Sequence, residues 1–344
     1  MRTALTTQRR SCTKFLRRYN RGMTLAPSAP KGARSPRFRR RKQPPAFELT
    51  ARDLAIVNVV ARFRFLTAPQ ISRLVGGSHK HILRRLKFLF DAAFLDRPPA
   101  QKLQLAHAID DGNRPFIYGL GRQGAHVLAE AGVPISDRLD WTTKNNSAKA
   151  LFLAHTIETA GVLIGFELAS RASNSARLVD QPDLFPYLPE ATQNARDPFR
   201  IRVTVTVKEH STPVAIGIVP DRVFSLFVAD NNRHNFALEL DRGTMDIKAR
   251  TLIGKSSFRR KLLGYYQLWQ DGRHTEAWGF KSFRVLTITP SEKRIAHMIT
   301  AQKEIVGPAG LNLFLFTTPQ LLKEKSPLGD AWISGKGNIV SLID

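Results

Sequence analysis

This chain has one cysteine, no acidic residue near its start and no uninterrupted apolar run of membrane length. Cys12 is the only cysteine among the 344 residues. This excludes a disulfide framework and leaves Cys12 without a partner at zinc-ligand spacing. The longest apolar run, Ala160–Phe166, ends at Glu167, well short of the roughly 20 residues that span a bilayer. No apolar core follows the basic N-terminus, so a secretory signal is not predicted. We expect a soluble, cytoplasmic protein without a membrane partner.

Acidic residues are absent before Glu48, whereas basic residues are abundant there. Lys and Arg outnumber Asp and Glu by 53 to 28, a formal net charge of +25. Fourteen of the 53 basic residues precede Ala46, so more than half of the excess lies in a Pro-, Ser- and Arg-rich segment. A segment so polar does not fold alone. This excess of positive charge predicts a partner with a high density of negative charge. DNA or RNA is the first candidate, and an anionic membrane surface is the second.

Residues 1–46 are therefore predicted to be a disordered basic arm. Its densest run is Arg39, Arg40 and Arg41, which would bind DNA phosphates in a salt-dependent way. Two other interpretations stay open: a solubilising tail, or translation that begins at Met23 instead of Met1.

Residues 47–133 show a pattern of three helices followed by two strands. Apolar residues recur at helical spacing after each of three Ser or Thr residues suited to N-capping. These N-cap candidates are Thr50, Thr67 and Ser78. Strands are expected at Leu103–Ile109 and Phe116–Leu120, because the turn sequence Asp-Asp-Gly-Asn lies between them. The order predicts a winged helix-turn-helix.

The helix predicted at Ser78–Phe94 has a basic outer face, with no acidic residue from His79 to Lys87. In a winged helix-turn-helix the third helix enters the major groove, where basic side chains contact phosphates and base edges. The alternative is an ordinary surface helix, or a winged helix that serves only protein contacts. The predicted DNA-binding residues are Lys80, His81, Arg84, Arg85 and Lys87, with Arg84 and Arg85 on bases or backbone and the lysines on phosphates.

A polar stretch at 134–147 predicts a linker, and 148–344 alternates helices with strands. An apolar helix is expected at 148–171, followed by a proline-rich loop at 178–198. Further strands are expected at 199–207, 223–228, 235–240, 283–289 and 311–317, and further helices at 257–269 and 291–306. The fold class is therefore mixed α/β, with a second, α/β domain over 148–344.

Three carboxylates surround the predicted hairpin of strands 223–228 and 235–240. Strand alternation places Glu239 and Asp241 on one face, and folding the hairpin brings Asp221 level with Asp241, give or take a residue. Lys261 borders the inward face of the following helix. Crowded carboxylates raise one another's pKa or recruit a cation, and their oxygen atoms suit Mg²⁺ or Mn²⁺. The alternative is ordinary pairing of Glu239 and Asp241 with arginines at a sheet edge.

This layout resembles the PD-(D/E)XK nuclease-like pattern. The resemblance implies a restriction-endonuclease-like fold for 148–344, in which Asp221 is the first acid, Glu239 is the second, and both hold the metal. Asp241 occupies the position of the motif's lysine. Lys261 would have to substitute for that lysine, so the implied catalytic set is Asp221, Glu239, Asp241 and Lys261.

The runs LELDRGTM, SSFRRKLLGYYQLW and FRVLTITPSEKR look like the replication-relaxation family of bacterial and plasmid proteins. With the winged-helix stretch, the resemblance covers roughly Thr50 to Trp332. It implies a bacterial DNA-binding role in plasmid replication, relaxation or mobilisation, with double-stranded plasmid DNA and a relaxase or replication initiator as partners. Three functions stay open: an accessory protein that binds without cutting, a metal-dependent DNA endonuclease or nickase, and a transcriptional regulator that dimerises through its C-terminal domain.

Overall fold

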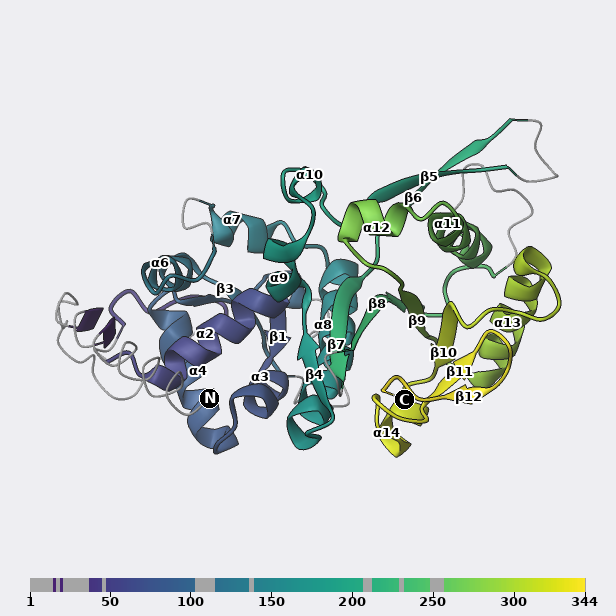
Figure 1. The fold of residues 1–344 in the computed structure, drawn as a ribbon. Helices are drawn as coiled ribbons and strands as arrows, with labels where there is room; N and C mark the ends of the chain where they lie inside the picture. Colours follow the sequence, from purple (N-terminus) through teal and green to yellow (C-terminus); the bar gives the residue numbers. More distant parts are fainter. Residues whose placement is uncertain are drawn as a thin grey trace. The chain divides into compact units, whose positions relative to one another are not determined.

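The computed structural model describes residues 15–16, 19–20, 37–44, 48–102, 115–135, 139–206, 212–228, 232–247 and 257–343. The chain divides into two compact units, unit 1 over Met1–Ile164 and unit 2 over Gly165–Asp344. Both units combine helices with strands, as the ribbon in Figure 1 shows. The predicted mixed α/β class is confirmed.

The first three long helices of unit 1 begin where the sequence predicts. They are α2 (Ala51–Phe63), α3 (Ala68–Val75) and α4 (His79–Asp91). Thr50 and Asp53 form a capping box, in which each side chain accepts the other residue's backbone N–H. Thr67 and Gln70 form the same arrangement at α3. Ser78 occupies the N-cap position of α4 without a capping hydrogen bond from its side chain. Local capping chemistry therefore sets the starts of α2 and α3.

A small antiparallel sheet accompanies these helices, with the strand order β1-β3-β2. Its strands are β1 (Phe65–Thr67), β2 (Leu95–Asp96) and β3 (Ile117–Leu120). The prediction at Phe116–Leu120 is confirmed by β3, whereas Leu103–Ile109 lies outside the described residues. Strand β1 is not predicted by the sequence, because three residues between two helices carry no measurable alternation. Helices α6 (Arg122–Glu130) and α7 (Trp141–Asn146) follow, and α7 occupies the segment predicted as a linker.

Helix α8 (Ala150–Ala172) crosses the division between the two units. By length and composition it could span a membrane, a property that the run-based sequence analysis missed. The core helix of a soluble protein passes the same test. Within unit 2, Phe166 of α8 is fully buried, with ring centroids 5.0 Å from Phe224 and 6.2 Å from Trp332. This part of α8 packs as a core helix does.

Unit 2 is built on a seven-stranded sheet of order β12-β11-β10-β9-β8-β7-β4, in which β8, β9 and β10 are parallel and the other pairs antiparallel. The strands are β4 (Ala176–Val179), β7 (Arg222–Val228), β8 (Arg233–Leu240), β9 (Arg284–Ile288), β10 (Phe314–Thr317), β11 (Trp332–Ser334) and β12 (Ile339–Val340). Helices α11 (Phe258–Gln270) and α13 (Glu292–Val306) share one core with Ala237 of β8 and Val285 of β9. Strands β7, β8 and β9 and helices α11 and α13 begin and end within two residues of their predicted bounds. Strand β10 ends where predicted but begins three residues later.

The segment predicted as a loop at 178–198 contains short helices. They are α9 (Gln181–Leu184), the 3₁₀ helix η1 (Phe185–Tyr187) and α10 (Glu190–Gln193). Pro182 lies in the first turn of α9, where a proline's missing N–H has no intrahelical partner to lose. The prolines therefore punctuate helices here instead of excluding them. Two further short helices of unit 2 are α12 (Arg273–Trp278) and α14 (Leu321–Glu324).

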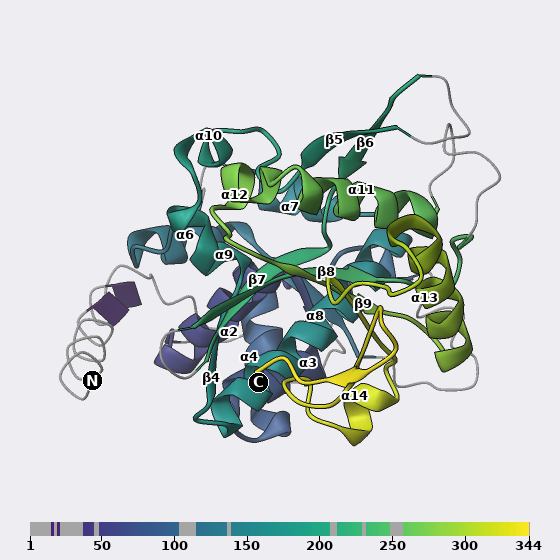
Figure 2. The same cartoon turned by 45° about the vertical axis from the view of Figure 1, so that its right-hand side comes forward.

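A separate two-stranded sheet, β5 (Ile201–Val205) with β6 (Val214–Ile218), extends beside α11 (Figures 1 and 2). Its apolar side chains pack on that helix at Gly264. A Cβ atom at Gly264 would lie 3.0 Å from Ile216 and 3.1 Å from Ile218, so a glycine permits this close approach. Strand β5 lies within the strand predicted at 199–207, whereas no strand was predicted at the position of β6.

Candidate nucleic-acid interface and carboxylate site

Helix α4 has one buried face and one exposed basic face. Ile82, Leu86 and Leu89 are fully buried. The exposed side chains include Lys80, His81 and Arg84, all predicted DNA contacts. Among the described residues, neither Lys80 nor Arg84 forms a side-chain hydrogen bond or an ion pair. Their charges are therefore available to an external partner.

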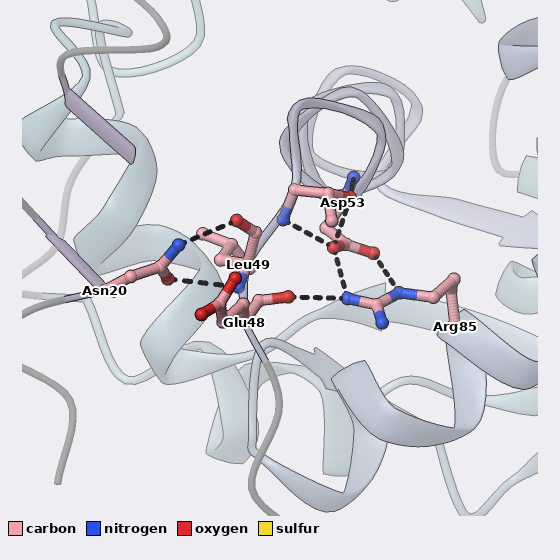
Figure 3. Close-up of polar contacts among 6 residues, drawn as sticks. Asn20, Glu48, Leu49, Asp53 and Arg85 are labelled. Atoms are coloured by element: carbon pink, nitrogen blue, oxygen red, sulfur yellow. Dashed lines mark hydrogen bonds and ion pairs between the residues drawn. The ribbon is translucent and has the colours of Figure 1, made fainter. Parts of the chain in front are cut away.

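Arg85, the neighbour of Arg84, lies in a different environment. Its guanidinium donates to both carboxylate oxygens of Asp53, at 2.8 and 2.5 Å, and to the Glu48 carbonyl at 2.9 Å (Figure 3). Asp53 is fully buried. Arg85 thus joins α4 to the start of α2, and its predicted DNA contact stays a prediction.

Lys87 and two arginines of the predicted arm also bind acids of unit 1. Lys87 Nζ lies 3.2 Å from the buried Asp91, and Arg41 Nε lies 3.6 Å from the same oxygen. Arg40 pairs with Asp96 and donates to the Phe90 carbonyl at 2.9 Å.

These contacts attach residues 37–44 to unit 1, although the sequence analysis placed them in a disordered arm. Arg39 is exposed, so of the three predicted arm contacts it alone keeps an exposed side chain.

In unit 2 the hairpin register places Asp221 beside Glu239. Arg222 pairs with Leu238, so the continued register sets Asp221 opposite Glu239. The Asp221 N–H donates to the Leu238 carbonyl at 2.9 Å, and its carboxylate accepts the Leu240 N–H at 2.7 Å. The prediction set Asp221 level with Asp241, give or take a residue, so the observed register differs from it by two residues.

Glu239 is buried, and both of its carboxylate oxygens are occupied by donors from α11. Lys261 donates to Oε2, and the Tyr265 hydroxyl donates to Oε1 at 2.6 Å. The prediction that Lys261 borders the inward face is confirmed. A pocket of about 210 Å³ adjoins this cluster. Its lining residues are Ile216, Gly217, Ile218, Val219, Glu239, Ser257, Arg260, Lys261 and Tyr265.

Burial and charge act against each other in this cluster. Burial raises the pKa of Glu239, while Lys261 opposes the rise and Asp221 adds to it. Burial alone would lower the pKa of Lys261, but the negative charges of Glu239 and Asp221 outweigh it and raise that pKa. Burial, with the charge of Glu239, raises the pKa of the Tyr265 hydroxyl well above its usual value. Lys261 and Tyr265 therefore both hold their protons tightly.

Asp241 is held by a different set of donors. Arg294 of α13 donates to its two carboxylate oxygens at 2.5 and 3.0 Å, and the Thr289 hydroxyl donates at 2.7 Å. Arg222, at the start of the neighbouring strand β7, binds Asp180 at 2.8 Å. The alternative of ordinary pairing with an arginine is therefore observed for Asp241, and its partner is Arg294.

The protein's own donors compete with a divalent cation for these carboxylates. Each Glu239 oxygen accepts from a protein donor, and Asp241 is neutralised by Arg294. In the part of the chain that the structure describes, no three His, Cys, Asp or Glu residues are grouped to hold a metal. Mg²⁺ or Mn²⁺ ligated by Asp221 and Glu239 would share the Glu239 oxygens with Lys261 and Tyr265.

Sequence reasoning missed Tyr265 and Arg294. Tyr265 lies four residues after Lys261 and therefore on the same helix face. That spacing was a usable signal. Arg294 lies 53 residues from Asp241, and nothing local connects the two.

The chain matches the family model described as replication-relaxation over residues 57–282, about two thirds of its length. The resemblance drawn from the sequence is thereby confirmed. No curated protein and no solved structure matches the chain. The matched range contains α4 as well as Asp221, Glu239 and Lys261, so both groups of candidate residues lie within it.

Proposed function

Because the chain belongs to the replication-relaxation family, we propose that it is a DNA-binding protein of plasmid replication, relaxation or mobilisation. In this proposal unit 1 holds double-stranded plasmid DNA as a winged helix, and unit 2 is a nuclease-like module that does not cut. A relaxase or a replication initiator, acting in the bacterial cytoplasm, is the expected protein partner.

The exposed face of α4 carries this proposal. It presents Lys80, His81 and Arg84 without an acidic residue between His79 and Phe90. Three helices with an antiparallel sheet of order β1-β3-β2 are the parts that a winged helix-turn-helix requires. The net charge of +25 favours the same partner.

The clamped carboxylates support binding without cutting. A metal-dependent phosphodiesterase needs carboxylate oxygens that are free to hold the ion. Here Lys261 and Tyr265 occupy Glu239, and Arg294 occupies Asp241. The protein's own donors thus neutralise the carboxylates of Glu239 and Asp241.

The second candidate function is a DNA endonuclease or nickase. The observation in its favour is that Asp221, Glu239 and Lys261 lie together beside a pocket of about 210 Å³. In this alternative Asp221→Ala leaves duplex binding unchanged and abolishes nicking that depends on Mg²⁺ or Mn²⁺.

A duplex-binding experiment on the full chain tests the proposal. Lys80→Ala with Arg84→Ala should weaken binding and lower the salt slope by up to about 2, because each lost phosphate contact removes about 0.9 from it. The matched control is Lys281→Ala with Lys293→Ala, which removes two exposed cations of unit 2. Equal binding by the two variants would refute the role of α4.

A further inference from the structure

The two-stranded sheet of unit 2 has an exposed face made of hydrogen-bond donors. Ile201, Val203 and Val205 point to the core around α11. Because side chains alternate along a strand, the residues between and beside them point outward. These exposed residues are Arg200, Arg202, Thr204 and Thr206, which we call the donor row. The row contains no acidic residue.

The neighbouring strand leaves the donor row uncovered. Gly217 pairs with Arg202, and Ala215 pairs with Thr204. A Cβ atom at Gly217 would lie 3.8 Å from a guanidinium nitrogen of Arg200, so Arg200 extends over this glycine. Small residues on β6 therefore give a broad partner close access to the arginines.

Two more arginines bind the edges of this sheet. Arg273 of α12 donates to the Arg202 carbonyl at 2.5 Å, on the edge of β5 that faces away from β6. Arg260 of α11 donates to the Ala215 carbonyl of β6 at 3.0 Å. Both satisfy backbone groups that an isolated pair of strands leaves open.

Among the residues that the structure describes, one acidic side chain forms an ion pair with the row. Asp197 is 3.4 Å from Arg200, and both side chains are largely exposed. An exposed pair of this kind is weak, so it leaves Arg200 able to exchange partners. The Arg202 guanidinium has no hydrogen bond or ion pair with any residue that the structure describes.

We propose that the donor row is a second DNA-contact surface, which binds phosphates of the duplex without reading sequence. Arginine and threonine side chains are common phosphate ligands. Alternate strand residues recur about every 6.6 Å, so the four residues span about 20 Å. That length corresponds to about six base pairs at 3.4 Å each. This inference rests on the proposed function, since it assigns unit 2 a direct part in holding the duplex.

The test measures binding of the full chain to a duplex of about 30 base pairs across a salt series. Arg200→Ala with Arg202→Ala should lower the salt slope by up to about 2 and weaken affinity at low salt about tenfold. Arg200→Lys with Arg202→Lys keeps the charge and should keep most of the slope. Asp197→Asn should strengthen binding, because it removes the acid beside the row.

The outcomes separate the donor row from the function of the chain. Lys281→Ala with Lys293→Ala makes the same charge change outside the row and serves as the control; thermal unfolding verifies that each variant is folded. If the row variant keeps the wild-type slope while the α4 variant loses binding, the row proposal fails and the proposed function stands. If the row variant binds the duplex as the wild type does but loses binding to a single strand of the same length, the assignment of the row to duplex DNA fails. If the wild type does not bind duplex, both proposals fail.

Discussion

Two buried carboxylates, one in each unit, are both held by a cation but differ in what surrounds them. Asp53 of unit 1 has a fully buried side chain, and Arg85 beside it is 19% exposed. Glu239 of unit 2 has a side chain 4% exposed, and Lys261 beside it is 33% exposed. Asp53 also accepts the Thr50 N–H and hydroxyl at 2.7 and 2.6 Å. Glu239 instead adjoins a pocket and accepts from Tyr265.

This difference distinguishes the Asp53–Arg85 pair, which is structural, from the Glu239–Lys261 cluster, which is a candidate site. The pair at Asp53 joins two helices and completes a capping box, so each donor has a structural task. The cluster at Glu239 lies where two strands and α11 meet a pocket, and its lysine reaches solvent. Perturbed pKa values beside a pocket are typical of functional sites, although structural ion pairs produce them too.

The largest expected effect is the loss of the cation from Glu239. Lys261→Met leaves a buried carboxylate without its charge partner, which should lower the free energy of unfolding of unit 2 by about 3 kcal/mol. Urea unfolding followed by the fluorescence of the buried Trp278 and Trp332 measures it. Lys281→Met, at an exposed position, is the control. A change below about 0.5 kcal/mol, typical of a surface site, would show that Glu239 does not depend on Lys261.

A smaller effect is expected at the matching pair of unit 1. Arg85→Leu should destabilise unit 1 by about 2 kcal/mol, because Asp53 keeps its hydrogen bonds from Thr50. Hydrogen exchange of the α2 amides measures the loss. Arg84→Leu, one residue along the same helix and exposed, should change stability by less than about 0.5 kcal/mol. Equal effects of the two substitutions would contradict the distinction drawn between these arginines.

Alkaline pH should act on unit 2 through Tyr265. Its pKa is raised from 10.0 in the folded chain, so the folded state keeps a proton that the unfolded state loses. Stability is therefore complete below about pH 10 and falls as the pH rises above it, by up to about 1.4 kcal/mol per pH unit. The raised pKa of Lys261 has the same sign. Urea unfolding between pH 9 and pH 11 should show a shallower decline for Tyr265→Phe than for the wild type; parallel declines would contradict the assignment.

The sequence predicted the features that depend on local chemistry. Thr50 and Thr67 were recognisable N-caps because capping uses residues within one turn. The register of Asp221 was displaced by two residues because such a slip leaves every side chain on the same face. Alternation alone could not detect it.

Pairing between distant residues was beyond prediction. Arg84 and Arg85 are adjacent in sequence and equally basic, yet about 100° of helix rotation separates an exposed side chain from one that reaches Asp53. Asp53 lies 32 residues before Arg85. The alternative that Glu239 and Asp241 form ordinary ion pairs depended in the same way on which cation the fold brings near.

The most direct measurement of the central claim is a gel assay of the full chain with supercoiled plasmid, with Mg²⁺ or Mn²⁺. The account predicts that the chain retards the plasmid and that, once the protein is removed, the plasmid is still supercoiled. Nicked plasmid from the wild type but not from Asp221→Ala would contradict it and would make unit 2 an endonuclease.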